Sequence, residues 1–322
     1  MSLLNFTSLD FDQIKETLKQ YLQSNSNFTD YDFEGSNLST ILDVLAYNTY
    51  ITSYNANMIS NEVFIDSATL RENVVALARN IGYVPRSRKA STATINFTVE
   101  PGITPPPTTI TLKKGPVAAS NAFGGQSFVF GLTKDVTKPV IDGVASFLDL
   151  DVKQGTVVDQ KFPYSTNNIN QRFILSNAGI DLSTLEVYVR PSATSSLLSS
   201  YTRQDSLFDA VTGSSITKDS LIYYIQEIED EQYELIFGDG IFGKALEDGN
   251  IVEVSYILSN GSEANGISNV SFSGKCTYTR NAVENTITSG ISIVTANIPS
   301  TGGDEIESVD SVKKFAPQIY ST

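Results

Sequence analysis

The sequence predicts a multidomain α+β protein that begins with an N-terminal α-helical bundle segment. Mainly antiparallel β domains of sandwich- or barrel-like architecture follow, and a short helix comes last. Three observations predict this order: apolar residues recur at helical spacing up to about Arg88, they alternate with polar residues after Lys89, and a helical pattern returns after Gly303. We expect four segments, namely residues 1–88, a β domain of 89–134 with 221–300, an inserted β domain of 135–220, and 301–322, a short helix leading to a C-terminal region absent here.

The first two helices are predicted from caps and apolar stripes. Asp10 is placed to cap the first helix, with Gln13 three residues later. The second helix starts after Gly35-Ser36-Asn37 and runs to about Asn61. One of its faces carries Leu38, Ile41, Leu42, Leu45 and Ala46, and a second face carries Val44, Tyr47, Ile51, Tyr54 and Met58. Because a single-sided amphipathic helix needs only one stripe, two stripes predict neighbours on two sides.

A third helix is predicted to begin near Asp66-Ser67 and to end at Gly82, a residue suited to a helix C-terminus. Its apolar stripe consists of Leu70, Val74, Leu77 and Ile81. Three helices packed only against one another can cover only some of these apolar stripes. The pattern alone leaves open a compact three-helix domain, a cap on the β domain, and a bundle completed by helices of other chains.

The β region is predicted from short alternating runs separated by turn residues. Residues 92–99 alternate without interruption, and further strands are expected at 109–112, 127–130, 147–152, 172–175, 185–189 and 221–225. Between the helices and the first strand lies a basic cluster, Arg86-Ser87-Arg88-Lys89. Such a cluster is more typical of a solvated linker than of a phosphate site.

The composition of the 322 residues excludes several classes of function. There is no histidine, which removes Ser-His-Asp and Cys-His catalysis and histidine-ligated zinc, although a pair of carboxylates could still act. The one cysteine, Cys276, excludes an internal disulfide framework. A net charge of −14 argues against nucleic acids and anionic membranes as main partners. No apolar run is long enough for a membrane helix and no secretory signal is evident, so we expect accumulation in the cytoplasm.

The segment Tyr233–Gly266 contains the clearest sequence motif. It reads as a strand, a turn at Gly238-Asp239-Gly240, a second turn at Asp248-Gly249-Asn250, and another strand. Taken locally, this is an ordinary β-hairpin. Its acids lack the spacing of a calcium loop, so no metal is predicted.

This order of phrases resembles the core of the baseplate J-like proteins, in particular the long baseplate wedge subunit of T-even-type contractile-tailed phages. Three other phrases resemble the same family: residues 30–50 (DYDFEGSNLSTILDVLAYNTY), residues 70–87 (LRENVVALARNIGYVPRS) and the stretch GGDEIESVDSVKKFAP. The resemblance covers nearly the whole chain and corresponds to the N-terminal half of such subunits, which continue into a dimerising region.

The resemblance implies a structural baseplate wedge protein of the virion, not an enzyme, that needs no cofactor and is assembled in the host cytoplasm. It implies a helical bundle shared with a second copy and another wedge protein, on which the sheath-initiating and other small baseplate proteins dock. Such a bundle would support baseplate assembly and the switch to sheath contraction. The partner-interface residues implied are Val44, Tyr47, Ile51, Tyr54, Met58, Leu70, Val74, Leu77 and Ile81.

Two other functions fit parts of the sequence. Serine- and threonine-rich β domains are also typical of receptor- or glycan-binding tail adhesins. An envelope-degrading enzyme would need a pair of carboxylates in the β domains. The absence of histidine and tryptophan counts against the enzyme, and the apolar faces of the N-terminal helices count against the adhesin.

Overall fold

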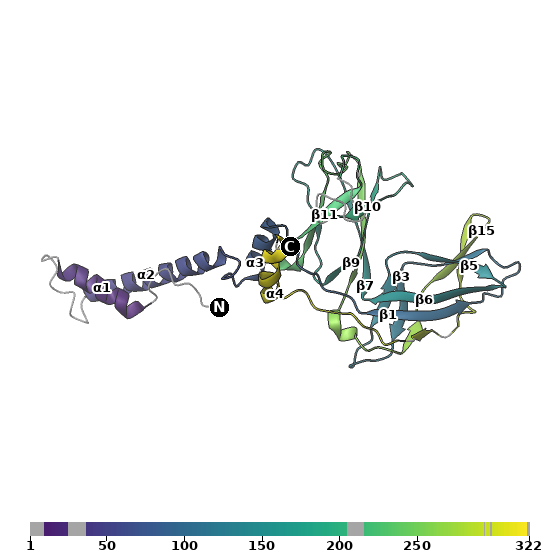
Figure 1. The fold of residues 1–322 in the computed structure, drawn as a ribbon, viewed down its shortest axis with the longest axis horizontal. Coiled ribbons are helices and arrows are strands. Elements are labelled where there is room, and N and C mark those ends of the chain that lie inside the picture. Colours follow the sequence, from purple (N-terminus) through teal and green to yellow (C-terminus); the bar gives the residue numbers. More distant parts are fainter. Residues whose placement is uncertain (1–9, 25–36, 205–215, 293, 297, 321–322) are drawn as a thin grey trace. The chain divides into compact units, whose positions relative to one another are not determined.

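The computed structural model describes residues 10–24, 37–204, 216–292, 294–296 and 298–320. The chain divides into a helical unit, Met1–Tyr83 with Ser308–Thr322, and a β unit, Val84–Glu307 (Figure 1). The predicted fold class is confirmed: helices come first, mainly antiparallel sheets follow, and a short helix comes last.

The described residues of the helical unit form four α-helices, which are α1 (Phe11–Gln23), α2 (Asn37–Glu62), α3 (Arg71–Asn80) and α4 (Val309–Phe315), and a 3₁₀ turn, η3 (Ala316–Tyr320). Asp10 caps α1 as predicted, since its Oδ1 accepts the Gln13 backbone N–H at 3.1 Å. Of the predicted cap of α2, Gly35 and Ser36 lie outside the described residues. Within the described part of the chain, no helix has the length and apolar composition needed to cross a bilayer.

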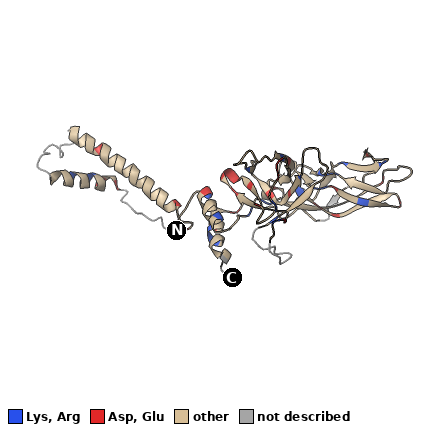
Figure 2. Ribbon diagram, turned by 90° about the horizontal axis from the view of Figure 1, so that it is seen from above, with Lys and Arg blue, Asp and Glu red and all other residues tan. Residues whose placement is uncertain are grey.

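Helix α1 packs along α2 (Figures 1 and 2). The Lys15 ammonium lies 2.5 Å from the Asp43 carboxylate. Leu42 and Ala46 are the buried apolar residues of α2, so the first predicted stripe is only partly covered.

Helix α3 packs against α4, which comes from the far end of the chain (Figure 1). Their common core consists of Ala68, Val74, Ala78, Val312 and Ala316. The predicted role of Gly82 is confirmed. It lies at φ 80°, and the paired hydrogen bonds Gly82 N–H to Arg79 O and Tyr83 N–H to Ala78 O end α3.

Sheet one contains ten strands in the order β14-β3-β4-β6-β5-β2-β15-β16, with β1 paired to β6 and β17. These strands are β1 (Thr92–Val99), β2 (Thr109–Leu112), β3 (Gly115–Ser120), β4 (Val129–Leu132), β5 (Val136–Ile141), β6 (Val144–Gln154), β14 (Val270–Phe272), β15 (Cys276–Arg280), β16 (Val283–Ile287) and β17 (Thr295–Ala296). Its apolar core includes Ile95, Phe130 and Phe147.

Sheet two contains seven strands in the order β7-β13-β9-β10-β11-β12-β8. These strands are β7 (Thr156–Pro163), β8 (Phe173–Leu175), β9 (Ile180–Arg190), β10 (Ser199–Arg203), β11 (Ile222–Glu227), β12 (Tyr233–Phe237) and β13 (Ile251–Leu258). All pairs are antiparallel except β10 with β11. A separate core around Tyr233, Leu235 and Tyr256 holds this sheet together.

Sheet membership differs from the expected domain limits. Strands β5 and β6 lie in sheet one, whereas β11, β12 and β13 lie in sheet two, so the second sheet is built from residues 156–258. The hairpin expected within Tyr233–Gly266 was wrong. Strand β12 pairs with β11 and β8, and β13 pairs with β7 and β9, because the 13-residue connection 238–250 is long enough to carry the chain across the sheet.

The basic cluster after α3 is part of the folded structure, so its interpretation as a solvated linker was wrong. Arg86 pairs with Asp304, and Arg88 Nε lies 3.2 Å from a Glu305 carboxylate oxygen. The backbones of 86–92 and 301–307 also exchange hydrogen bonds. We call these two paired segments the strap. The strap joins the points where the chain enters and leaves the β unit.

Candidate partner-binding surface

A row of exposed apolar residues lies on α2, along the second predicted stripe, which we call the α2 seam. Its members stand at heptad-like spacing and are all exposed: Val44 64%, Tyr47 61%, Ile51 37%, Tyr54 49% and Met58 43%. Contiguous apolar surface of this kind on a helix is typical of a site that another protein covers.

Charge is scarce on α2. Among its 26 residues only Asp43 and Glu62 are charged, and Figure 2 shows the helix as an almost unbroken tan ribbon. Asp43 is paired with Lys15 of α1, and Glu62 is bonded to residues at the start of α3. No charge of α2 would therefore have to lose its partner if the seam became buried.

Two threonines of α2 have hydroxyl groups that are already hydrogen-bonded within the helix. The Thr49 hydroxyl donates to Leu45 O at 2.9 Å, and the Thr52 hydroxyl donates to Asn48 O at 2.8 Å. A hydroxyl bonded within its own helix does not need water as a partner. These threonines can therefore enter a helical bundle at small cost.

A further group of exposed apolar residues extends the surface beyond the seam. Ile41 and Leu45 belong to the first predicted stripe but are exposed, and Ile59, Val63 and Phe64 continue the apolar surface to the α2–α3 corner. These last three were missed by the sequence analysis. For Val63 and Phe64 the signal was the apolar run Val63-Phe64-Ile65 directly after the helix.

The four expected interface residues of α3 lie in different surroundings. Leu70 is exposed, whereas Val74 is fully buried against α4, and Leu77 and Ile81 are partly buried in the same core. The sequence pattern gave no sign of this, because the helix that covers α3 follows the whole β unit in the chain. The exposed surface of α3 therefore excludes Val74.

Glu62 fixes the corner between α2 and α3. Its carboxylate accepts hydrogen bonds from the Thr69 N–H at 2.8 Å, the Thr69 hydroxyl at 2.6 Å and the Asn73 side-chain amide at 2.8 Å. Partial burial opposes ionisation, but these donors and the Leu70 N–H outweigh it and lower the pKa of Glu62 to about 2. The charge also faces the N-terminus of α3, where an anion is favoured.

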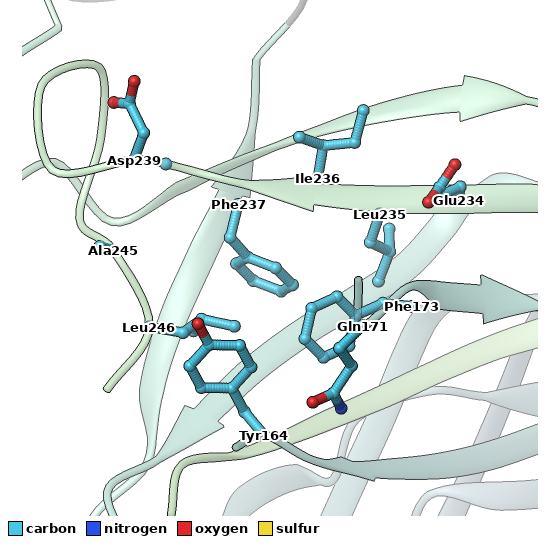
Figure 3. Close-up of a pocket in the computed structure, with 11 residues that line it drawn as sticks. Tyr164, Gln171, Phe173, Glu234, Leu235, Ile236, Phe237, Asp239, Ala245 and Leu246 are labelled. Atoms are coloured by element: carbon cyan, nitrogen blue, oxygen red, sulfur yellow. The ribbon is translucent and has the colours of Figure 1, made fainter. Parts of the chain in front are cut away.

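Sheet two contains an open pocket of about 420 Å³, which Figure 3 shows beneath the end of β12. Tyr164, Phe173, Phe237 and Leu246 form its apolar wall. Aromatic rings beside acidic side chains could bind a glycan, as in a tail adhesin, or could support catalysis by a pair of carboxylates, as in an envelope-degrading enzyme.

The polar side chains at this pocket all serve the local fold. Glu234 accepts two hydrogen bonds from the Arg172 guanidinium, each 2.7 Å long. Gln171 donates to Pro163 O at 2.6 Å. Asp239 Oδ1 accepts the N–H groups of Ile241 and Phe242, and these bonds lower the pKa of Asp239. A general acid would instead need a raised pKa.

Asp248, an acid of the second turn in the Tyr233–Gly266 motif, also stabilises the local fold through hydrogen bonds. Asp248 Oδ1 accepts the Thr166 N–H at 2.9 Å and the Ser165 hydroxyl at 3.0 Å, which ties two loops of sheet two together. Among the residues that the structure describes, no three acidic or cysteine side chains are grouped closely enough to hold a metal ion.

Comparison with known proteins finds similarity both for the helical region that carries this surface and for most of the chain. Residues 10–83 match the family model described as the helical domain of gp6-like baseplate wedge proteins. Baseplate wedge protein gp6 of Enterobacteria phage T4 is 27% identical over 289 residues, which are 84% of this chain and 41% of that protein. The chain thus spans about two fifths of the length of this relative.

Among solved structures, the cryo-EM structure of the baseplate of the anti-feeding prophage (AFP) aligns with 95% of this chain and 52% of its own chain, at 13% identity and a TM-score of 0.28. Residues 10–83, which carry the α2 seam, are thus similar to a gp6-like helical domain, and 84% of the chain is similar to a T4 protein named for the baseplate wedge.

Proposed function

We propose that this protein is a structural component of a baseplate wedge in a contractile phage tail and that the α2 seam is its assembly surface. The observation that carries the proposal is the exposed apolar row Val44–Met58 on a helix whose two charges are already paired. The similarity to a T4 protein named for the baseplate wedge supports the location in the virion.

The seam provides enough apolar surface for association. Burying a half-exposed side chain of this size contributes about 1 kcal/mol, so the five seam residues contribute roughly 5 kcal/mol per chain. Part of this favourable free energy is offset by the translational, rotational and side-chain entropy that is lost on association. A stable bundle therefore needs more than one apolar helix, which agrees with an interface shared among several helices.

The partners we propose are a second copy of this chain and another wedge protein, whose helices complete the bundle. The sheath-initiating protein and other small baseplate proteins would dock on it. On α3 the proposed contact is reduced to Leu70 and the exposed parts of Leu77 and Ile81, while Val74 acts indirectly by holding α3 on α4.

Light scattering after size exclusion tests the assembly, with this chain alone and co-expressed with wedge proteins of the same genome. We expect complexes that disappear when Tyr47, Ile51 and Tyr54 are changed to Glu. The matched variant Tyr47→Phe, Ile51→Val, Tyr54→Phe keeps the seam apolar and should keep the complexes. A folded monomer that forms no complex with any of the co-expressed wedge proteins would overturn the proposal.

We also propose that the bundle takes part in the switch to sheath contraction, with its interfaces rearranging as rigid bodies. Disulfide or chemical cross-links between α2 and its partner helix should then block contraction of assembled tails. Cross-linked tails that contract normally would show that the bundle is not the moving interface.

A further inference from the structure

The chain crosses between sheet one and sheet two at two neighbouring places, residues 154–156 and 258–260, which we call the elbow. Strand β6 ends at Gln154 and β7 begins at Thr156, so Gly155 forms the whole connection. Gly155 lies at φ 136°, and a Cβ atom at this position would be 2.1 Å from Leu258 O. Only glycine lets the two crossings touch.

Buried hydrogen bonds fix the elbow. The Gln154 side chain is 2% exposed, and its Oε1 accepts the Ser259 hydroxyl at 3.1 Å and the Asn260 N–H at 3.0 Å. Its Nε2 donates to Asn260 Oδ1 at 2.9 Å. Since buried hydrogen-bonded groups are costly to separate, the two crossings stay together.

Away from the elbow, both sheets line a cleft of about 640 Å³. Two ion pairs connect the sheets at or beside this cleft: Lys114 Nζ lies 2.8 Å from Asp159 Oδ1, and Lys134 Nζ lies 2.9 Å from Glu186 Oε1. Both lysines belong to turns of sheet one, and both acids belong to strands of sheet two. We call these two pairs the charge latch. A third ion pair, between Lys153 and the buried Asp181 at 3.5 Å, involves the residue next to Gln154 and so belongs with the elbow.

The charge latch differs from the elbow in its exposure to solvent. The side chains of Lys114, Asp159 and Lys134 are 45%, 50% and 59% exposed, and that of Glu186 is 21% exposed. Exposed ion pairs contribute little to stability and are screened by salt over about 3 Å at 1 M ionic strength. The hydrogen bond to Glu186 raises the pKa of Lys134, so this lysine stays charged.

We propose that the junction between the two sheets is a hinge, in which the elbow holds the sheets together and the charge latch sets the angle between them. High ionic strength, or loss of the two lysines, opens the cleft without unfolding either sheet. The proposal concerns the β unit alone and does not depend on the function proposed for the α2 seam.

Distances between two spin labels, one per sheet, test the hinge in the full chain. Ser146→Cys on β6 and Ser200→Cys on β10 of sheet two place both labels at exposed positions, while Cys276 is buried. The variant Lys114→Gln, Lys134→Gln removes the latch. The control Lys161→Gln breaks the pair with Glu253, also 2.9 Å long, which lies entirely within sheet two.

We expect the Lys114→Gln, Lys134→Gln variant to raise the population with a longer distance by about threefold or more. The parent protein should show the same longer distance on going from 0.05 to 1 M NaCl, and Lys161→Gln should match the parent. Identical distance distributions in all three proteins at both salt concentrations would overturn the hinge. If the double variant folds poorly, the distance distributions of the parent protein at low and high salt still test the hinge.

Discussion

At the scale of single residues, the two acids of α2 are both engaged within the chain, which leaves the rest of the helix surface uncharged. One of them, Glu62, also fixes the end of the helix. Glu62 is the last residue of α2, and its carboxylate binds the first turn of α3 through Thr69, Leu70 and Asn73. One charge thus connects two helices.

We predict that Glu62→Gln speeds amide hydrogen exchange in residues 66–72 by about fivefold, because a loss of roughly 1 kcal/mol is expected for a partly buried capping charge. The folded pKa of about 2 lies below the ordinary 4.5. The stabilisation is therefore complete above pH 4.5 and is lost as the pH falls toward 2. The exposed Glu72→Gln serves as control. Equal exchange in both variants would contradict the capping role.

Cys276 is another residue whose surroundings decide its chemistry. It is fully buried in the core of sheet one, and burial raises the pKa of its thiol to about 11. We predict that the native protein does not react with a thiol reagent such as Ellman's reagent at pH 8, and that one thiol per chain reacts in denaturant. Rapid reaction of the native protein would show that the core of sheet one opens readily.

At the scale of elements, the sequence predicted those parts whose signals are local. The bounds of β1, β2 and β12 match the alternating runs, and α2 ends within a residue of the predicted position. The α2 seam was predicted for the same reason, since heptad spacing within one helix needs no knowledge of the rest of the fold.

Pairings between distant segments could not be predicted in this way. Period-2 alternation shows that a strand has a buried face but not which strand lies beside it. That is why β5 and β6 were assigned to the wrong side of the junction and why β12 and β13 were expected to form a hairpin. The covering of Val74 by α4 has the same cause.

The turn between β15 and β16 allows an element-scale prediction. Asn281 and Ala282 both lie at positive φ, 51° and 60°. Alanine in this conformation costs roughly 1–2 kcal/mol, whereas glycine adopts it freely at an entropic cost of about 0.5–1 kcal/mol in the unfolded chain. We therefore expect Ala282→Gly to stabilise the β unit by about 0.5 kcal/mol in urea unfolding, and Ala282→Val to destabilise it. The opposite order would contradict the turn geometry.

At the scale of the whole molecule, the strap pairs the segments where the chain enters and leaves the β unit. These segments, 86–92 and 301–307, lie at the two ends of that unit, whose limits are Val84 and Glu307. The Glu307 N–H donates to Arg86 O, and the Arg86 N–H donates to a Glu307 carboxylate oxygen at 2.9 Å. These reciprocal hydrogen bonds hold the first and last segments of the β unit together.

We predict that Arg86→Ala with Arg88→Ala loosens the strap, seen as faster amide exchange in residues 301–307. Each of these partly exposed ion pairs contributes about 0.5 kcal/mol, so a three- to tenfold increase is expected. Lys89→Ala is the control from the same basic cluster, because Lys89 contacts Asp304 through backbone hydrogen bonds that the substitution keeps. Unchanged exchange in the double variant would mean that the backbone pairing alone holds the strap.

The central claim is that the α2 seam is covered by partner helices in the assembled tail. Photo-cross-linking inside intact tails tests it most directly, with the photoreactive residue at Tyr54 in the seam and, as control, at the exposed Ser146 on β6 of the β unit. We expect Tyr54 to capture a helix of a second copy or of another wedge protein, in higher yield than Ser146. Equal yields at both positions, or capture of nothing at Tyr54, would show that the seam stays uncovered and would contradict the proposed function.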